Sequence, residues 1–266
     1  MNSLVHNNKA IELQRQLKLC IENILYVMRK IFIIIFIILL YPLLINIWHG
    51  VLKSPISSTI HQVNCQQLSN DVSGDISNII STIESHGNKL DSKNNYGSAE
   101  GYKAIRSVFK HRLPLVCKKI DKRVEDLIEQ CCKATGKKLF KADCKNEKYC
   151  WFVRLYNKNN HFLDWHFDNN FTKGLRYTMV NTLFITECNT SHFMVKDNNN
   201  RIRTEQSKQG TGVVYNGSDI KHAISTQTND CIRIVLVVPL YETLNKSLIG
   251  QYRQFVRNIT DSVLTL

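Results

Sequence analysis

The hydrophobic pattern changes its period near Tyr149, and this change constrains the fold more than any other feature of the sequence. Before it, apolar residues recur at the three- and four-residue spacing of helices, whereas after it they alternate as in strands. Turns rich in Asn, Gly, Asp and Lys separate the candidate strands, which are 150–156, 162–168, 175–186, 192–196, 212–216, 221–225 and 231–238. Many short strands in succession predict a β-sandwich or a jelly-roll barrel.

Helices are predicted on both sides of this β-rich region. Amphipathic spacing indicates helices over Asp75–Glu84, Ala99–Lys110 and Leu115–Thr135, and Gly136 supplies a C-terminal stop to the last of these. A further amphipathic segment, Ser247–Val263, is expected to pack on the outside of the domain. The predicted class is therefore α+β, with a jelly-roll core and flanking helices.

The first candidate site residues close the stretch Trp151–Asp168, whose last three residues are His166, Phe167 and Asp168. Successive side chains of a strand point to opposite faces, so His166 and Asp168 share one face while Phe167 takes the other. An imidazole and a carboxylate on one face are two of the three ligands in the facial triad of non-haem Fe(II) sites. His222, on a later candidate strand, can supply the third ligand.

Arg233 stands inside the apolar run CIRIVLVVPLY, which the alternation predicts as a strand. It shares a face with Val235 and Val237, and a guanidinium in such a core needs an anionic partner. Because arginine binds carboxylates through two parallel hydrogen bonds, a small dicarboxylate is a natural ligand.

These residues form an ordered motif of H-x-D, a distal histidine and a following arginine. There are 53 residues between Asp168 and His222, and Arg233 comes eleven residues after His222. In this order and spacing, the chain resembles the 2-oxoglutarate- and Fe(II)-dependent oxygenases.

The chain is most similar to the prolyl-4-hydroxylase-like branch of these oxygenases, over about residues 150–242. The R-x-Y … H-x-D run of that branch matches Arg154-Leu155-Tyr156 followed by His166-Phe167-Asp168. Two positions differ, because animal collagen-type prolyl hydroxylases have Lys where this chain has Arg233, and the branch has glycine where this chain has Asn159. Prolyl, lysyl, other side-chain, lipid and small-molecule substrates therefore all stay open.

The resemblance implies a double-stranded β-helix in which three residues bind Fe(II), namely His166, Asp168 and His222. It also implies 2-oxoglutarate as co-substrate, held by Arg233, with dioxygen as the second co-substrate and ascorbate as a further cofactor. Tyr156 matches a family tyrosine that contacts 2-oxoglutarate, and an ordinary core tyrosine is the alternative. Asn181, a polar residue in an apolar strand, is expected to hydrogen-bond the co-substrate.

The implied activity is hydroxylation of a protein side chain or small molecule, with release of succinate and CO2. Related halogenases have a small residue at the carboxylate position, so Asp168 favours hydroxylation. Two alternatives stay open: a non-catalytic, membrane-anchored jelly-roll module that binds a ligand, and a nucleic-acid demethylating oxygenase. The net charge of +13 would suit the latter, but the cations are spread and no nucleic-acid reader motif occurs, so no nucleic-acid partner is expected.

An uncharged run of eighteen residues, Ile31–Trp48, comes before the helical and β-rich regions. This length is close to the minimum that crosses a bilayer, so residues 31–49 are predicted to form an uncleaved transmembrane anchor. Lys18, Arg29 and Lys30 precede the run, and this excess of cations places the N-terminus in the cytoplasm. The chain is therefore predicted to be a type II membrane protein whose domain lies in the lumen of the endoplasmic reticulum or Golgi.

The cysteines and sequons agree with a lumenal domain. Eight of the nine cysteines follow the uncharged run, an even number that permits disulfides in an oxidising compartment. Proximity in the sequence suggests the pair Cys144–Cys150, whereas zinc is not expected because no C-x2-C knuckle occurs. N-x-S/T sequons occur at Asn170, Asn189, Asn216, Asn245 and Asn258.

The sequence thus predicts a linear organisation of segments. They are a cytoplasmic tail (1–30), a transmembrane anchor (31–49), a stem and helical linker (50–98), supporting helices (99–148), the β-helix core (149–242) and a C-terminal helix (243–266).

Overall fold

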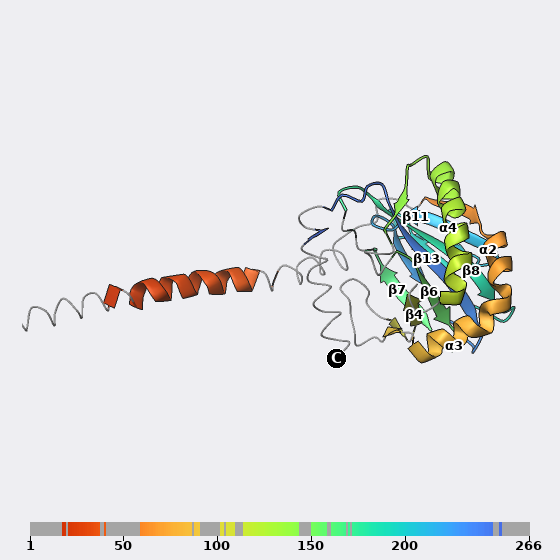
Figure 1. Cartoon of the computed structure of the whole chain (residues 1–266), viewed down its shortest axis with the longest axis horizontal. Coiled ribbons are helices and arrows are strands. Elements are labelled where there is room, and N and C mark those ends of the chain that lie inside the picture. Colours follow the sequence, from red (N-terminus) through yellow and green to blue (C-terminus); the bar gives the residue numbers. More distant parts are fainter. Residues whose placement is uncertain are drawn as a thin grey trace, which may run out of the picture. The chain divides into compact units, whose positions relative to one another are not determined.

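The computed structural model of the chain (Figure 1) describes residues 18–19, 21–37, 40, 59–86, 88–90, 102–103, 105–109, 114–143, 150–158, 161–168, 170, 172–246 and 250–251. The chain divides into two compact units, Met1–Ile47 and Trp48–Leu266.

In the first unit, residues 21–37 are helical and their apolar side chains are exposed. Within the described part of the chain, no helix is both long enough and apolar enough to span a membrane. Much of the predicted anchor, residues 38–39 and 41–49, lies outside the described residues.

The longer helical elements described in the second unit are α2 (Gln66–Val72), α3 (Ile76–His86) and α4 (Pro114–Thr135), and the short 3-10 turn η2 (Ser73–Asp75) joins the first two. The predictions for α3 and α4 are confirmed. Ile79 and Ile83 of α3 are fully buried, and Gly136 follows α4 with a φ of +66°. This left-handed conformation suits glycine and ends the helix.

The strands form two sheets in which every pair is antiparallel. The larger sheet has the order β1 (Ile60–Asn64), β11 (Thr211–Asn216), β8 (Arg176–Ile185), β13 (Arg233–Tyr241), β6 (Phe152–Tyr156), β4 (Ile105–Phe109) and β2 (Asn88–Leu90), and β5 (Phe140–Lys141) also pairs with β13. The smaller sheet has the order β10 (Ile202–Glu205), β9 (Phe193–Lys196), β12 (Lys221–Ile224), β7 (Phe162–His166) and β3 (Tyr102–Lys103).

Two hydrophobic cores lie on opposite faces of the larger sheet. The helix-side core joins residues of α2, α3 and α4 to one face of that sheet, including Met179, Leu183 and Leu236, and Figure 1 shows these helices covering the sheet. The inter-sheet core joins the other face to the smaller sheet and contains Phe152, Tyr156, Leu163, Phe193, Val195, Tyr215, Ile220, Ile224, Val235 and Val237. Because β13 alternates between the two cores, all nine of its residues are buried. The architecture is an α+β jelly roll.

The predicted helix Ala99–Lys110 is wrong, because residues 102–103 and 105–109 are strands. The apolar residues there fit both the helical and the strand period, and pairing with other strands selects the strand. β4 pairs with β6 on one side and with β2 on the other, so its backbone hydrogen bonds come from partners that no local pattern reveals. β1, β2 and β5 likewise lie in segments predicted as stem or supporting helices. The larger sheet therefore includes strands from well before residue 149.

One disulfide among the described residues joins Cys188 to Cys231, with an S–S distance of 1.95 Å. It links the segment after β8 to the segment before β13. The suggested pair Cys144–Cys150 includes Cys144, which lies outside the described residues, as does most of the predicted C-terminal helix. Residues 250–251 of that helix are helical.

Candidate metal centre

Antiparallel pairing brings two histidines from distant parts of the chain together. His222 of β12 lies directly opposite His166, the last residue of β7, and the centroids of their rings are 4.1 Å apart. Asp168 lies two residues beyond the end of β7, where its backbone N–H donates to the carbonyl of Gly217 at 2.8 Å. This hydrogen bond fixes the backbone of Asp168 beyond the end of β7, in a position from which its carboxylate faces the imidazoles.

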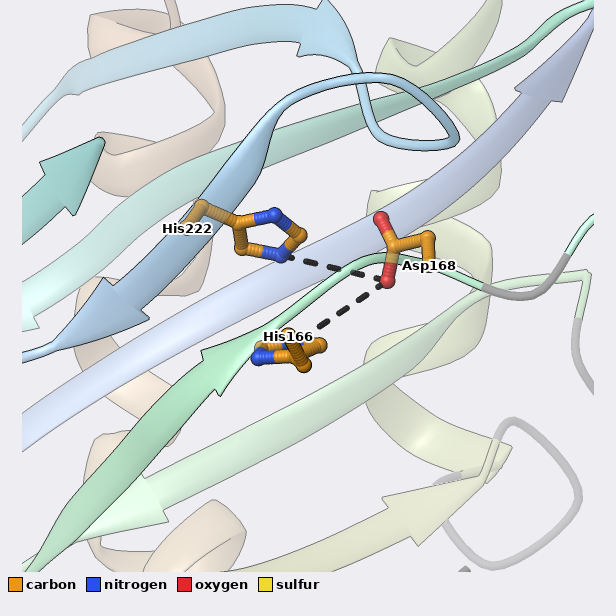
Figure 2. Close-up of side chains that lie close together, drawn as sticks. All are labelled: His166, Asp168 and His222. Atoms are coloured by element: carbon orange, nitrogen blue, oxygen red, sulfur yellow. Dashed lines mark ion pairs between the residues drawn. The ribbon is translucent and has the colours of Figure 1, made fainter. Parts of the chain in front are cut away.

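The three side chains converge on one point (Figure 2). Asp168 Oδ1 lies 4.0 Å from His166 Nε2 and 3.9 Å from His222 Nε2. One ligand atom from each residue can be chosen so that all three lie within 4.8 Å of one another. Two imidazole nitrogens and one carboxylate oxygen are the donors of a facial triad, so the residues fit a divalent metal such as Fe(II).

Each imidazole is oriented by a backbone carbonyl. His166 Nδ1 lies 2.7 Å from the carbonyl oxygen of Asp164, and His222 Nδ1 lies 3.0 Å from that of Ile220. Because a carbonyl oxygen only accepts, we assign the ring hydrogen to Nδ1 in both residues. Each Nε2 then keeps its lone pair for a metal, an arrangement common to metal-binding histidines.

The carboxylate of Asp168 is held by groups that the larger sheet supplies. The Thr178 hydroxyl donates to Oδ2, while the Arg176 guanidinium lies 3.7 Å from Oδ1. Gly217 packs so closely that a Cβ at this position would stand 2.2 Å from Oδ2. Oδ1 is therefore the oxygen that faces both histidines.

Burial and charge set the protonation of the triad. Burial, assisted by His222, lowers the pKa of His166 to about 3, and burial also lowers the pKa of His222. Burial alone would raise the pKa of Asp168, but Arg176 and the two histidines outweigh it and hold that pKa below its usual value. Neutral imidazoles beside a carboxylate are the state in which these residues bind a metal.

Arg233 is buried on the face of β13 that lines the inter-sheet core. Its Nη1 lies 3.4 Å from Ser191 Oγ, and its Nε has no hydrogen-bond partner among the described residues. No carboxylate of the described chain forms an ion pair with it. A buried guanidinium without an anion is costly, so this position suits an anionic ligand.

The structure places the two other predicted co-substrate residues on opposite faces of the larger sheet. Tyr156 lies directly opposite Arg233 in the β6–β13 pair, and the Arg233 guanidinium carbon is 5.7 Å from its ring centroid. Asn181 pairs with Leu236, a residue of the helix-side core. The prediction for Asn181 is therefore wrong, because strand alternation turns it away from the triad and under the helices.

Sequence reasoning did not assign roles to several residues that the structure brings to the triad. These residues are Arg176, Thr178, Tyr215 and Gly217. The Tyr215 ring lies 4.8 Å from that of His222. The signal that was available is the alternation of β8, in which Arg176 and Thr178 share a face that Asn181 does not.

Comparisons of the sequence with protein-family models and with curated proteins find no match. Comparison of the structure with solved structures does find similar folds. A prolyl hydroxylase from Trichoplax adhaerens, in complex with a peptide fragment of the hypoxia inducible factor oxygen degradation domain, has a TM-score of 0.52 at 13% identity, covering 69% of this chain and 83% of that one. A prolyl-4-hydroxylase from Pseudomonas putida has a TM-score of 0.50 at 11% identity, covering 75% of this chain and 97% of that one.

A third similar structure is the non-haem α-ketoglutarate-dependent epimerase SnoN from nogalamycin biosynthesis, with a TM-score of 0.52 at 10% identity over 68% of this chain and 76% of that one. At these identities the likeness concerns the fold. The resemblance expected from the H-x-D, His and Arg motif is thus confirmed at that level: this chain has the fold of the 2-oxoglutarate- and Fe(II)-dependent oxygenases, including the prolyl hydroxylases.

Proposed function

We propose that this protein is an Fe(II)- and 2-oxoglutarate-dependent dioxygenase that hydroxylates its substrate and releases succinate and CO2. The observation that carries the proposal is the convergence of His166, Asp168 and His222, each held in a ligand orientation by its own hydrogen bond. An accidental cluster of this composition would not need both imidazoles to present Nε2 to the same carboxylate oxygen.

The roles of the residues follow from their positions. His166, Asp168 and His222 would hold Fe(II), and the bound iron supplies the activation of dioxygen. Thr178 and Arg176 keep the carboxylate of Asp168 ionised and correctly turned. Arg233 would bind the distal carboxylate of 2-oxoglutarate, and Tyr156 forms the wall beside it.

The substrate is proposed at a coarser level. One similar structure is in complex with a peptide fragment of the hypoxia inducible factor oxygen degradation domain, and another is named as an epimerase from nogalamycin biosynthesis, so both protein and small-molecule substrates are compatible with the fold. We favour a prolyl or other protein side chain, with ascorbate as an accessory reductant to be tested. No observation favours the non-catalytic binding module or the nucleic-acid demethylating oxygenase.

We also propose that residues 31–49 anchor the protein in a membrane and that the oxygenase domain lies in the lumen of the endoplasmic reticulum or Golgi. The support is the uncharged run with its preceding cations, together with the Cys188–Cys231 disulfide, a bond that persists in oxidising compartments. Digestion of sealed microsomes with a protease would test this, because a domain cleaved without detergent would be cytoplasmic.

The oxygenase proposal is tested by spectroscopy without turnover. The chain is loaded anaerobically with Fe(II), and the visible absorption is followed as 2-oxoglutarate is added. We expect a weak charge-transfer band in the wild type and none in His222→Ala, with His61→Ala, a histidine on β1, as the matched control. Failure of the wild type to bind iron would refute the proposal.

A further inference from the structure

A third guanidinium, besides those of Arg176 and Arg233, points into the space between the sheets, and the proposed chemistry does not use it. Arg154 lies on β6 between Phe152 and Tyr156, which both belong to the inter-sheet core. It pairs with Val235 of the same core, so alternation directs its side chain to the interior rather than to the helices. Its guanidinium carbon lies 4.9 Å from the centroid of the Phe152 ring.

Arg154 shares this space with the triad. Tyr215 belongs to the same inter-sheet core, and its ring centroid lies 4.8 Å from that of His222. Arg154 also stands two residues before Tyr156 on the same face of β6, and Tyr156 lies opposite Arg233. Arg154 and the triad therefore border one inter-sheet core.

No group of the described chain neutralises Arg154. Its side chain is half-buried, and its Nε is fully buried without a hydrogen-bond partner among the described residues. The carboxylate of Asp168 is already shared by Arg176 and both histidines. Arg154 is therefore a half-buried cation without an anionic partner among the described residues, and such a position suits an anionic ligand.

The proposed ligands do not remove this excess of positive charge. 2-Oxoglutarate carries two negative charges, which offset the two positive charges of a divalent metal ion. Among the described residues named here, three guanidiniums remain, those of Arg154, Arg176 and Arg233, against the carboxylate of Asp168. The loaded site would thus keep a net positive charge, and such a site attracts an anionic substrate.

We infer that Arg154 binds a carboxylate group of the primary substrate, so that a protein substrate carries an acidic side chain close to the residue that reacts. The inference rests on the proposed function. Carboxylate is the expected anion because its two oxygens match the planar fork of a guanidinium. The same chemistry could come from the metal-proximal carboxylate of 2-oxoglutarate, and the experiment separates the two sources.

The probe is acetate, with acetamide as its uncharged counterpart of equal shape. The chain is loaded with Mn(II), a paramagnetic ion that takes the place of Fe(II), and saturated with 2-oxoglutarate, which occupies Arg233. The relaxation of the methyl protons of acetate then reports binding near the metal. We expect a saturable enhancement for acetate, and none for acetamide.

Variants of Arg154 make the assignment specific. Arg154→Met should weaken acetate binding at least about tenfold, as expected for loss of a charge-assisted hydrogen bond. The acetate affinity of Arg154→Lys should lie between those of the wild type and Arg154→Met. Arg203→Met, at an exposed arginine on β10, is the matched control and should bind acetate as the wild type does. Circular dichroism of each variant confirms that it is folded.

The outcomes are distinct. Equal acetate relaxation in Arg154→Met and the wild type would overturn the inference. A second pair of results would also overturn the inference. In it, 2-oxoglutarate abolishes acetate binding, and Arg154→Met weakens 2-oxoglutarate binding as strongly as Arg233→Met does. Arg154 would then bind the co-substrate. Absence of Mn(II) or 2-oxoglutarate binding in the wild type would instead refute the proposed function on which the inference rests.

Discussion

Gly217 lies against Asp168 so closely that a methyl group on Gly217 would stand 2.2 Å from Oδ2 and 2.8 Å from the hydroxyl oxygen of Thr178. The carbonyl of Gly217 also accepts the backbone N–H of Asp168. Only a residue without a side chain leaves room for the orientation in which Oδ1 faces the histidines.

Gly217→Ala is therefore expected to turn the carboxylate away and to lower Mn(II) affinity by roughly tenfold or more. Gly74→Ala is the control, because a methyl there would meet nothing within 4 Å. Isothermal titration calorimetry measures both affinities. Unchanged metal binding in Gly217→Ala would show that Asp168 does not need this orientation.

Thr178→Val replaces the hydroxyl that donates to Asp168 Oδ2 with a methyl group of similar size. Because the carboxylate loses its orienting partner, we expect metal affinity to fall about tenfold to a hundredfold. Thr204→Val, at an exposed position on β10, should have no effect. Equal affinities of the two variants would mean that Thr178 only packs.

Arg233→Met should weaken 2-oxoglutarate binding by at least about tenfold, the value of a charge-assisted hydrogen bond. Metal affinity should change little, because Arg233 makes no contact with the triad in the described chain. Titration of 2-oxoglutarate into the Mn(II)-loaded protein measures the effect, with exposed Arg201→Met as control. Wild-type affinity in Arg233→Met would leave the buried guanidinium without a ligand role.

Asn181→Leu tests the correction to the sequence prediction. Neither polar atom of the Asn181 side chain has a hydrogen-bond partner in the described chain, and the residue is fully buried. An apolar residue of similar size should raise the free energy of unfolding by about 1 kcal/mol, because no polar group is then buried unpaired. Chemical denaturation measures the change, and a fall in 2-oxoglutarate affinity would restore Asn181 to the site.

Cys131 and Cys132 are neighbours on α4 with different environments. Burial, followed by the neighbouring Cys132, raises the pKa of Cys131 to about 12, whereas Cys132 is half-buried. Thiolate is the reactive form, so near pH 8 iodoacetamide should modify Cys132 at least about tenfold faster than Cys131. Fragment mass spectrometry distinguishes the two sites. The difference in modification rate should vanish in denaturant. Equal rates in the native protein would contradict the packing of α4.

Several residues of the site could be predicted from the sequence alone. The order of His166, Asp168, His222 and Arg233 could be read directly, and strand alternation placed Arg233 on the same face as Val235, as the structure shows. The amphipathic spacing of Asp75–Glu84 and Leu115–Thr135 likewise identified α3 and α4. These features succeed because they depend on contacts between residues near in sequence or on the two-residue repeat of a strand.

Tertiary structure decided the remainder. Alternation states which residues of β8 share a face, but only the packing of helices on one side revealed that Thr178 faces the triad and Asn181 does not. Ile105–Phe109 is a strand because it pairs with β2 on one side and with β6 on the other. The pairing of His222 with His166 joins segments more than fifty residues apart, and such register is set by the whole folded sheet rather than by any local pattern.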